Sequence, residues 1–435
     1  MWFVGDSMNH FNFKLALVLV LSVFQFETGY ALNQTPKDEM KAKLKSLTPE
    51  ARLDAISRAE IMEKKIDRLH RESPEKISEI NMVQELSQFC GANYVYTNEE
   101  AKPNVGWPTV SCKYHRAETT LGGSTNKFLC DFNETKKNGE KVIKTRKVKY
   151  LAFTGIKNSE LVPSLLASTM ARLVGFHTES YCPAIVKCEN CPTNMPYEFG
   201  KSQGRPSRET FDFADAMVEI PADLMTITPN TPRIHPRWPH GLNWNEVLKI
   251  QATSGKSVRE KAIEREAWLL WLNFIVDMDA HTSNQRVACD KASLNGSEVF
   301  CDKPVLYSHD YGQAFFRRFQ FNKWRSHSPL IQNADESCRG GMTSEVIKGE
   351  KGSGATEIYI GPLISAEARD FLVSRLRNVS DRQWLDILRI ANAERLLRVK
   401  PSDFVAAVRL KIEAMANIRC ALFDSRTSAL SMQTQ

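Results

Sequence analysis

The stretch DMDAHTSNQRVAC, residues 277–289, is the most informative one for the fold, because several polar side chains follow an apolar segment directly. The preceding run WLLWLNFIV, residues 268–276, is typical of a buried helix. Asp279 and Asn284 stand at the two ends of the motif D-A-H-T-S-N. Such side chains can cap a helix and form an Asx turn, or they can supply oxygen ligands to a cation. The rest of the chain has to decide between these alternatives.

A second polar motif follows in YSHDYGQAF, residues 307–315. The residues before it, 305–307, are apolar enough to form a buried strand, so Asp310 is expected at the end of that strand. Gly312 allows the backbone to turn sharply beside this acid. Taken alone, an aspartate near a glycine is also common in ordinary turns.

Upstream, the pattern changes from alternating to helical spacing. Alternation and turn residues predict a small antiparallel sheet over residues 105–155, with further short strands at 178–188 and 216–220. Apolar residues at helical spacing predict a helix over 158–176 that ends at Gly175. Lys149 lies inside a predicted strand, and Glu160 opens the predicted helix.

Along the chain, the order of features is Lys149 in a strand, Glu160 at a helix start, the D-x4-N motif and the D-Y-G motif. This order suggests a particular chemistry. Phosphoryl transfer needs a lysine to neutralise phosphates, a glutamate to hold that lysine, and a carboxylate to orient the attacking hydroxyl. It also needs hard oxygen ligands for a divalent cation. We therefore expect the β-lysine, the helix glutamate, D-x4-N and D-Y-G to meet in one cleft.

The order resembles that of the protein-kinase-like superfamily. D-A-H-T-S-N is similar to the D-R-H-x-x-N loop of phosphatidylinositol 3-/4-kinases and HipA-like kinases, and D-Y-G stands where the superfamily has D-F-G. The stretch from residue 147 to 192 also resembles a group of exported bacterial proteins. The resemblance covers about residues 120–320. It departs from the family at LGGSTNKF, residues 121–128, which lacks the G-x-G-x-x-G pattern.

The resemblance implies an α+β, two-lobed fold, with a β-rich lobe at 105–225 that holds one helix and a mainly helical lobe at 226–435. It implies ATP and Mg²⁺ (or Mn²⁺) as cofactors, with Asp279 orienting or deprotonating the acceptor hydroxyl. The other implied roles are loop support by His281, metal binding by Asn284 and Asp310, phosphate contact by Lys149 paired with Glu160, and an adenine-side hinge at Val218 and Glu219.

The N-terminus predicts export. Lys14 precedes the short apolar run LALVLVLSVF, and Gly29-Tyr30-Ala31 is typical of a cleavage site, so residues 1–31 are predicted to be a signal peptide. An uncleaved anchor is the alternative, but the run is short for a membrane span. Residues 32–104 are predicted to be a helical segment, with helices at 46–69 and 73–89, that packs on the rest of the chain.

The chain has ten cysteines, all beyond residue 31, and an even number in an exported protein predicts disulfides. Cys188 and Cys191 have a spacing also found in zinc sites, but no second ligand pair of that kind follows. Cys289 and Cys301 flank a polar loop and are expected to form a disulfide across a hairpin.

The composition argues against nucleic acid and a membrane as partners. The hydrophobic fraction of 42%, the charged fraction of 25% and the net charge of +7 are ordinary for a globular protein. The basic run at 136–149 fits a solvated strand pair better than a nucleic-acid site. After signal cleavage no stable membrane insertion is expected.

Two functions remain open on this basis. One is an exported kinase-like phosphotransferase acting on a protein, lipid or sugar hydroxyl. The other is a non-catalytic, disulfide-braced binding protein on the same scaffold, since ATP is scarce outside the cell. A hydrolase built on Asp277, Asp279 and His281 is a third alternative, although no G-x-S-x-G or H-E-x-x-H motif accompanies it.

Overall fold

The computed structural model describes most of the chain from Lys65 onward, and all of these residues belong to one compact unit, residues 54–435. It describes residues 65–91, 94–96, 106–116, 126–135, 139–151, 160–191, 210–220, 225–226, 257–280, 285–289, 291–295, 298–302, 305–308, 310–343 and 361–421. The predicted signal peptide, His281 and Asn284 lie outside the described residues. The predicted pair of Cys289 and Cys301 lies outside the described side chains.

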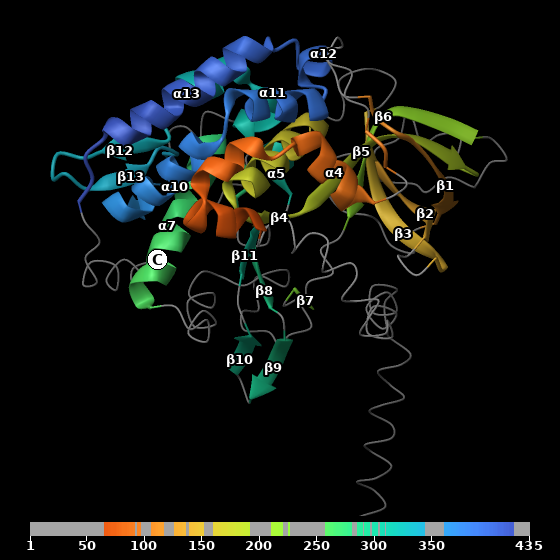
Figure 1. The fold of residues 1–435 in the computed structure, drawn as a ribbon, viewed down its shortest axis with the longest axis horizontal. Helices are drawn as coiled ribbons and strands as arrows, with labels where there is room; N and C mark the ends of the chain where they lie inside the picture. The colour runs from red at the N-terminus through yellow and green to blue at the C-terminus, as the bar shows by residue number, and fades with distance from the viewer. Residues whose placement is uncertain are drawn as a thin grey trace, which may run out of the picture. The chain divides into compact units, whose positions relative to one another are not determined.

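Five strands form a closed barrel in the order β1-β2-β3-β6-β5 (Figure 1). Their bounds are β1 (Thr109–His115), β2 (Lys127–Thr135), β3 (Lys141–Tyr150), β5 (Ser180–Glu189) and β6 (Thr210–Ile220). All neighbouring strands are antiparallel except β1 and β5, which run parallel and close the barrel. The predicted small sheet is confirmed. β6 begins at Thr210 rather than at residue 216, because alternating Asp and Phe residues extend the strand.

Side chains alternate between the barrel interior and its outer face. The rings of Phe128, Tyr150 and Phe213 fill the interior, with ring centroids 4.6 to 5.6 Å apart. Lys127 and Lys149 are the neighbours of two of these residues in sequence, so they point to the other face. They stand directly opposite each other in the β2–β3 pair.

The predicted helix is confirmed as α5 (Leu161–Val174), and every one of its residues is buried. It ends at Gly175, whose left-handed backbone (φ 85°) is the conformation that glycine adopts readily at a helix end. The helix contacts β5 of the barrel as well as α10 and α11 of the helical part. Its first turn, at Glu160, is thereby held between the two parts.

The helical part and the N-terminal segment surround α5. Their elements are η1 (Pro74–Glu79), α4 (Met82–Cys90), α7 (Val258–Ile275), α8 (Phe321–Ser326), α10 (Ala366–Asn378), α11 (Asp381–Ile390), α12 (Ala393–Leu397) and α13 (Pro401–Asn417), with a further helical stretch at 65–72. Ser257 and Ser380 open their helices with capping boxes, as their sequence positions indicate. The α+β fold class is confirmed, with a small sheet and a larger helical part.

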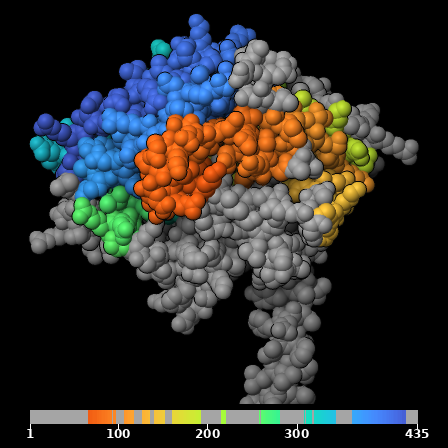
Figure 2. All heavy atoms as spheres, viewed as in Figure 1, coloured from red at the N-terminus to blue at the C-terminus, as the bar shows by residue number. Residues whose placement is uncertain are grey.

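The N-terminal segment packs against the rest of the unit. In Figure 2 the red and orange atoms of this segment form a band between the blue C-terminal helices and the yellow strands. Arg375 Nη2 lies 2.5 Å from Asp67 Oδ1, and Gln383 Nε2 donates to the carbonyls of Ile77 and Ile80 at 2.6 and 3.0 Å. The predicted single helix at 73–89 is wrong, because Asn81 starts a new helix by accepting two backbone N–H groups.

Short strands complete the structure. They are β4 (His177–Thr178), β7 (Met225–Thr226), β8 (Gln285–Cys289), β9 (Lys291–Asn295), β10 (Glu298–Asp302), β11 (Val305–Ser308), β12 (Leu330–Gln332), β13 (Cys338–Gly340) and β14 (Leu363–Ile364). A 3₁₀ turn, η4 (Tyr311–Gln313), and a short π-helix, η5 (Phe315–Phe319), follow β11. One sheet has the order β4-β11-β8-β7. Because β11 ends at Ser308, Asp310 falls just beyond the strand, as the sequence predicts.

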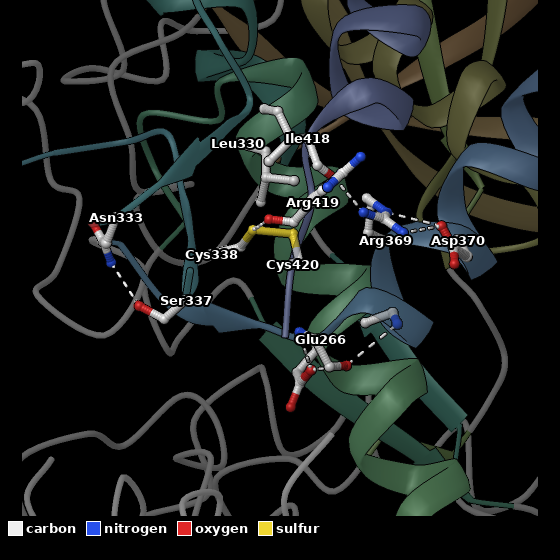
Figure 3. The surroundings of a disulfide bond; sticks show 12 residues. Glu266, Leu330, Asn333, Ser337, Cys338, Arg369, Asp370, Ile418, Arg419 and Cys420 are labelled. Carbon is white, nitrogen blue, oxygen red and sulfur yellow. Dashed lines mark hydrogen bonds and ion pairs between the residues drawn. A yellow bond between two sulfur atoms is a disulfide. The ribbon is translucent and has the colours of Figure 1, made fainter. Parts of the chain in front are cut away.

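Four disulfides are described, which confirms the predicted disulfide chemistry for eight cysteines. The pairs are Cys90–Cys182, Cys112–Cys130, Cys188–Cys191 and Cys338–Cys420. The sulfurs of Cys112, Cys130 and Cys188 lie within 4.8 Å of one another, but each belongs to a disulfide and is not a thiolate ligand. Figure 3 shows the Cys338–Cys420 bond, which links β13 to the segment after α13 and lies near the Arg369–Asp370 ion pair.

Among the helices that the structure describes, none has the length and hydropathy that a membrane-spanning helix requires.

A buried lysine in α13 gives a prediction about pH. Lys411 Nζ donates to the His327 carbonyl at 2.5 Å and lies 5.0 Å from the Trp324 ring centroid. Burial lowers the pKa of Lys411 from 10.5 to about 7. Because the unfolded chain then binds more protons between these pH values, this lysine destabilises the fold at pH 7 and ceases to do so near pH 10.

We therefore expect Lys411→Met to raise the melting temperature at pH 7 by about 3 °C or more and to leave it nearly unchanged at pH 10. Melting curves at both pH values check this. Lys400→Met, at an exposed position before the same helix, is the control and should show no such difference. A Lys411 variant that is destabilised at pH 7 would contradict the account.

Candidate functional site

The centre of the candidate site is an ion pair between the barrel and the segment after β11. Lys149 Nζ lies 3.0 Å from Asp310 Oδ1, although the two residues are 161 positions apart. The lysine side chain is 2% exposed and the aspartate side chain is 32% exposed. Burial alone lowers the pKa of Lys149, but Asp310, Glu179 and Glu219 outweigh that effect and raise it above its ordinary value. Lys149 is therefore a permanently charged ammonium inside the protein.

The backbone of Asp310 is held in an unusual conformation. Its φ of 61° and ψ of 68° lie in the left-handed region, which few residues other than glycine adopt. Its N–H donates to Glu179 Oε2 at 3.2 Å, and the Glu179 N–H donates to the Ser308 carbonyl at 3.0 Å. Glu179, which follows β4, thereby holds the residues after β11 in place. In this position the Asp310 carboxylate faces Lys149.

Glu160 packs against the D-Y-G turn. Gln313 Nε2 donates to Glu160 Oε1 at 3.0 Å. A β-carbon added at Gly312 would lie 2.8 Å from Glu160 Cβ and 2.8 Å from Glu160 Oε2. Glycine is therefore required at this position for close approach. Burial raises the pKa of Glu160, the charge of Lys149 lowers it, and Asp310 and Asp279 raise it further.

Asp277 and Asp279 have different surroundings. Asp277 is fully buried, and its Oδ1 accepts the Asp279 N–H at 3.2 Å, which forms an Asx turn. Burial, with help from Asp279, raises the pKa of Asp277 well above its ordinary value. Asp277 shapes the turn from a fully buried position. Asp279 is half-buried and lies within electrostatic range of Glu160.

Two further carboxyl groups share the Lys149 face of the barrel. Glu219 pairs with Lys147, and Tyr181 O–H donates to Glu179. Burial, followed by the neighbouring Glu179, raises the pKa of Glu219.

The predicted hinge residues are part of the sheet. Val218 faces Cys182 and Val148 across the two neighbouring strands, and its side chain is fully buried. Glu219 is likewise paired on both sides, with Lys147 and Tyr181. A contact with adenine would have to come from the end of β6 rather than from these two paired residues.

The structure thus brings together Lys149, Glu160, Asp279 and Asp310, four residues that are far apart in the sequence. Gln285, which follows Asn284 in the chain, pairs with Ser308, two residues before Asp310. The predicted partner of Lys149 was Glu160, whereas the ion pair that the structure shows is with Asp310. Glu160 acts on Lys149 through its charge.

Sequence reasoning missed three residues of this cluster. Glu179 lies between β4 and β5 and had no motif to mark it. Tyr181 looked like an ordinary strand residue. Lys127 lies near the end of the glycine-containing stretch 121–128, and this position was a signal that could have identified it.

The residues present fit a magnesium-bound nucleotide. Partly exposed carboxylates at positions 279 and 310 supply oxygen atoms, the ligands that Mg²⁺ prefers. The buried ammonium of Lys149 supplies a fixed positive charge for a phosphate group. Both kinds of group are present within one electrostatically linked cluster.

Fold and site together define an α+β protein with a charged cluster between a small β-barrel and a helical part. No protein-family model matches the chain, and neither does a curated protein. Among solved structures, the chain is distantly similar to the proinflammatory kinase CtkA of Helicobacter pylori. The match has 10% sequence identity and a TM-score of 0.37, and it covers 75% of this chain and 100% of that chain.

The contact between Glu160 and Gly312 gives a prediction. We expect Gly312→Ala to lower the free energy of unfolding by about 1–3 kcal/mol, because the added methyl group overlaps the Glu160 side chain. In a Glu160→Gly background the same change should cost much less, since all three Glu160 atoms nearest to the added methyl group, Cβ included, are then absent. Chemical denaturation of the four proteins of this double-mutant cycle measures the coupling. Additive effects would show that the two residues do not contact each other.

Proposed function

We propose that the chain is a kinase-like phosphotransferase that uses ATP with Mg²⁺ or Mn²⁺ and modifies a hydroxyl acceptor. The observation that carries this proposal is the Lys149–Asp310 ion pair of 3.0 Å, which joins a buried strand lysine to an acid after a distant strand. Perturbed titratable groups that cluster in this way are typical of functional sites. The distant likeness to a kinase concerns the fold and is not needed for this argument.

Each residue of the cluster receives a role in this proposal. Lys149 binds the nucleotide phosphates, and the negative charge of Glu160 helps to position the ammonium group of that lysine. Asp310, with Asn284, binds the divalent cation, which when bound neutralises phosphate charge. Asp279 faces the acceptor, and His281 supports its loop.

The proposed reaction is a single transfer. Asp279 orients the acceptor hydroxyl and accepts its proton as the oxygen attacks the terminal phosphorus of ATP. The bond between that phosphorus and the bridging oxygen breaks, and ADP leaves with the bond electrons. Asp279 suits this role because its side chain is partly exposed, unlike that of the fully buried Asp277.

A non-catalytic binding protein on the same scaffold is the second candidate. The four described disulfides favour it, because they point to an oxidising compartment outside the cytosol, where ATP is scarce. Export through the predicted signal peptide, to the periplasm or beyond, is part of either proposal. The acceptor in the first case is a protein, lipid or sugar hydroxyl; nucleic acid and stable membrane insertion have no place in either.

Nucleotide binding separates these two functions. We expect millimolar ATP with Mg²⁺ to raise the melting temperature by several degrees, because a ligand that binds the folded state stabilises it. Asp310→Asn should remove this rise, since the amide is a poorer cation ligand. Asp335→Asn, on an exposed turn of the helical part, is the matched control and should keep it.

Asp279→Asn should keep the nucleotide-induced rise but lose phosphoryl transfer, measured as ATP consumption with a hydroxyl acceptor. The absence of any rise in the wild-type protein would favour the non-catalytic function. Unfolding of the Asp279 variant would show instead that this residue is structural.

A further inference from the structure

Lys127 is the first residue of β2 and stands directly opposite Lys149 on β3. Directly opposed residues of an antiparallel pair point to the same face, with their β-carbons about 5 Å apart. The Lys127 ammonium therefore shares the face of the barrel that carries Lys149 and the Lys147–Glu219 ion pair. Two like charges at opposed positions repel each other, so this arrangement costs stability unless an anion compensates for it.

Three other basic residues, all on β3, have acidic partners. Lys149 pairs with Asp310, Lys147 pairs with Glu219, and Arg146 Nη2 lies 2.8 Å from Glu134 Oε1. Lys127 is half-buried, and within the described part of the chain its side chain makes no hydrogen bond or ion pair. It is thus a cation without a fixed partner, held beside a permanently charged lysine.

The charges around Lys127 come from three elements. Burial, together with the charges of Lys149 and Lys147, lowers the pKa of Lys127 from 10.5 to about 8. Asp310, beyond β11, and Glu160, before α5, raise the pKa of Lys127, but the pKa stays below its ordinary value. A bound anion at this position would favour the charged form of the lysine.

We propose that Lys127 is a second phosphate-binding lysine, which contacts the polyphosphate chain of the nucleotide beside Lys149. This inference rests on the proposed function and adds a residue that neither the motifs nor the resemblance indicated. A polyphosphate fits better than a single carboxylate ligand, because two neighbouring ammonium groups can each bind a different phosphate oxygen. It also explains how the chain can bind a nucleotide without a G-x-G-x-x-G loop.

Binding of ATP–Mg²⁺ to variants of the full mature chain tests this role. Lys127→Met should weaken binding by about 10-fold to 100-fold, the effect of one lost charge-assisted hydrogen bond. Lys127→Arg should stay within about threefold of the wild type, because the charge is kept. Lys144→Met is the matched control, since Lys144 lies on β3 but pairs with Glu134 at 3.7 Å, and it should bind ATP normally.

Two further readouts exclude a merely structural role. Adenosine, which has no phosphate, should bind Lys127→Met as it binds the wild type. Without nucleotide, Lys127→Met should melt at the wild-type temperature or above, because the repulsion with Lys149 is removed.

The outcomes are distinct. If the wild type binds ATP and Lys127→Met binds it equally well, the role of Lys127 is overturned while nucleotide binding stands. If Lys127→Met loses adenosine as well as ATP, or melts well below the wild type, Lys127 is structural and the inference fails. If the wild type binds no ATP–Mg²⁺, both this inference and the proposed function fail.

Discussion

Lys149 carries a positive charge into the interior of the protein, where that charge must be neutralised. An unpaired buried ammonium costs several kcal/mol, and removing one member of a buried pair typically costs about 3–5 kcal/mol. Asp310 supplies the direct partner, and Glu179, Glu219 and Glu160 act on Lys149 through their charges. These acids come from β6, from the ends of β4 and β11, and from the start of α5. The charge of Lys149 thus links the barrel, helix α5 and the segment after β11 through electrostatic interactions.

The backbone around this charge is held in costly conformations. Asp310 and Val276 both have left-handed dihedral angles, and for a β-branched residue such as Val276 this is rare. Gly312 allows Glu160 to pack against the turn where any side chain would collide. Such conformations cost about 1–3 kcal/mol each and persist where the surrounding structure imposes them, most often at functional sites. Here Asp310 belongs to the cluster and Val276 lies three residues before Asp279, whereas other residues with such angles, Glu336, Asn392 and Arg398 among them, are not part of it.

The sequence predicted the fold class and a helix at 158–176, which the structure has at 161–174, because periodicity is a local signal. That Lys149, Glu160, Asp279 and Asp310 lie near one another was expected from the order of their motifs. The sequence did not predict the partner of Lys149, because a choice between two nearby acids depends on tertiary geometry. Glu179 was missed for a related reason: its importance comes from β11, which lies far away in sequence and pairs with β4. The break at Asn81 was missed because capping by a side chain competes with a helical pattern that continues across it.

The most direct test is a crystal structure of the mature chain with Mn²⁺ and a non-hydrolysable ATP analogue. The account predicts an anomalous manganese peak about 2.0–2.6 Å from an Asp310 carboxylate oxygen. It also predicts a phosphate oxygen within hydrogen-bond distance of Lys149 Nζ. A nucleotide and metal bound elsewhere, with the Lys149–Asp310 pair intact and no phosphate beside it, would contradict it.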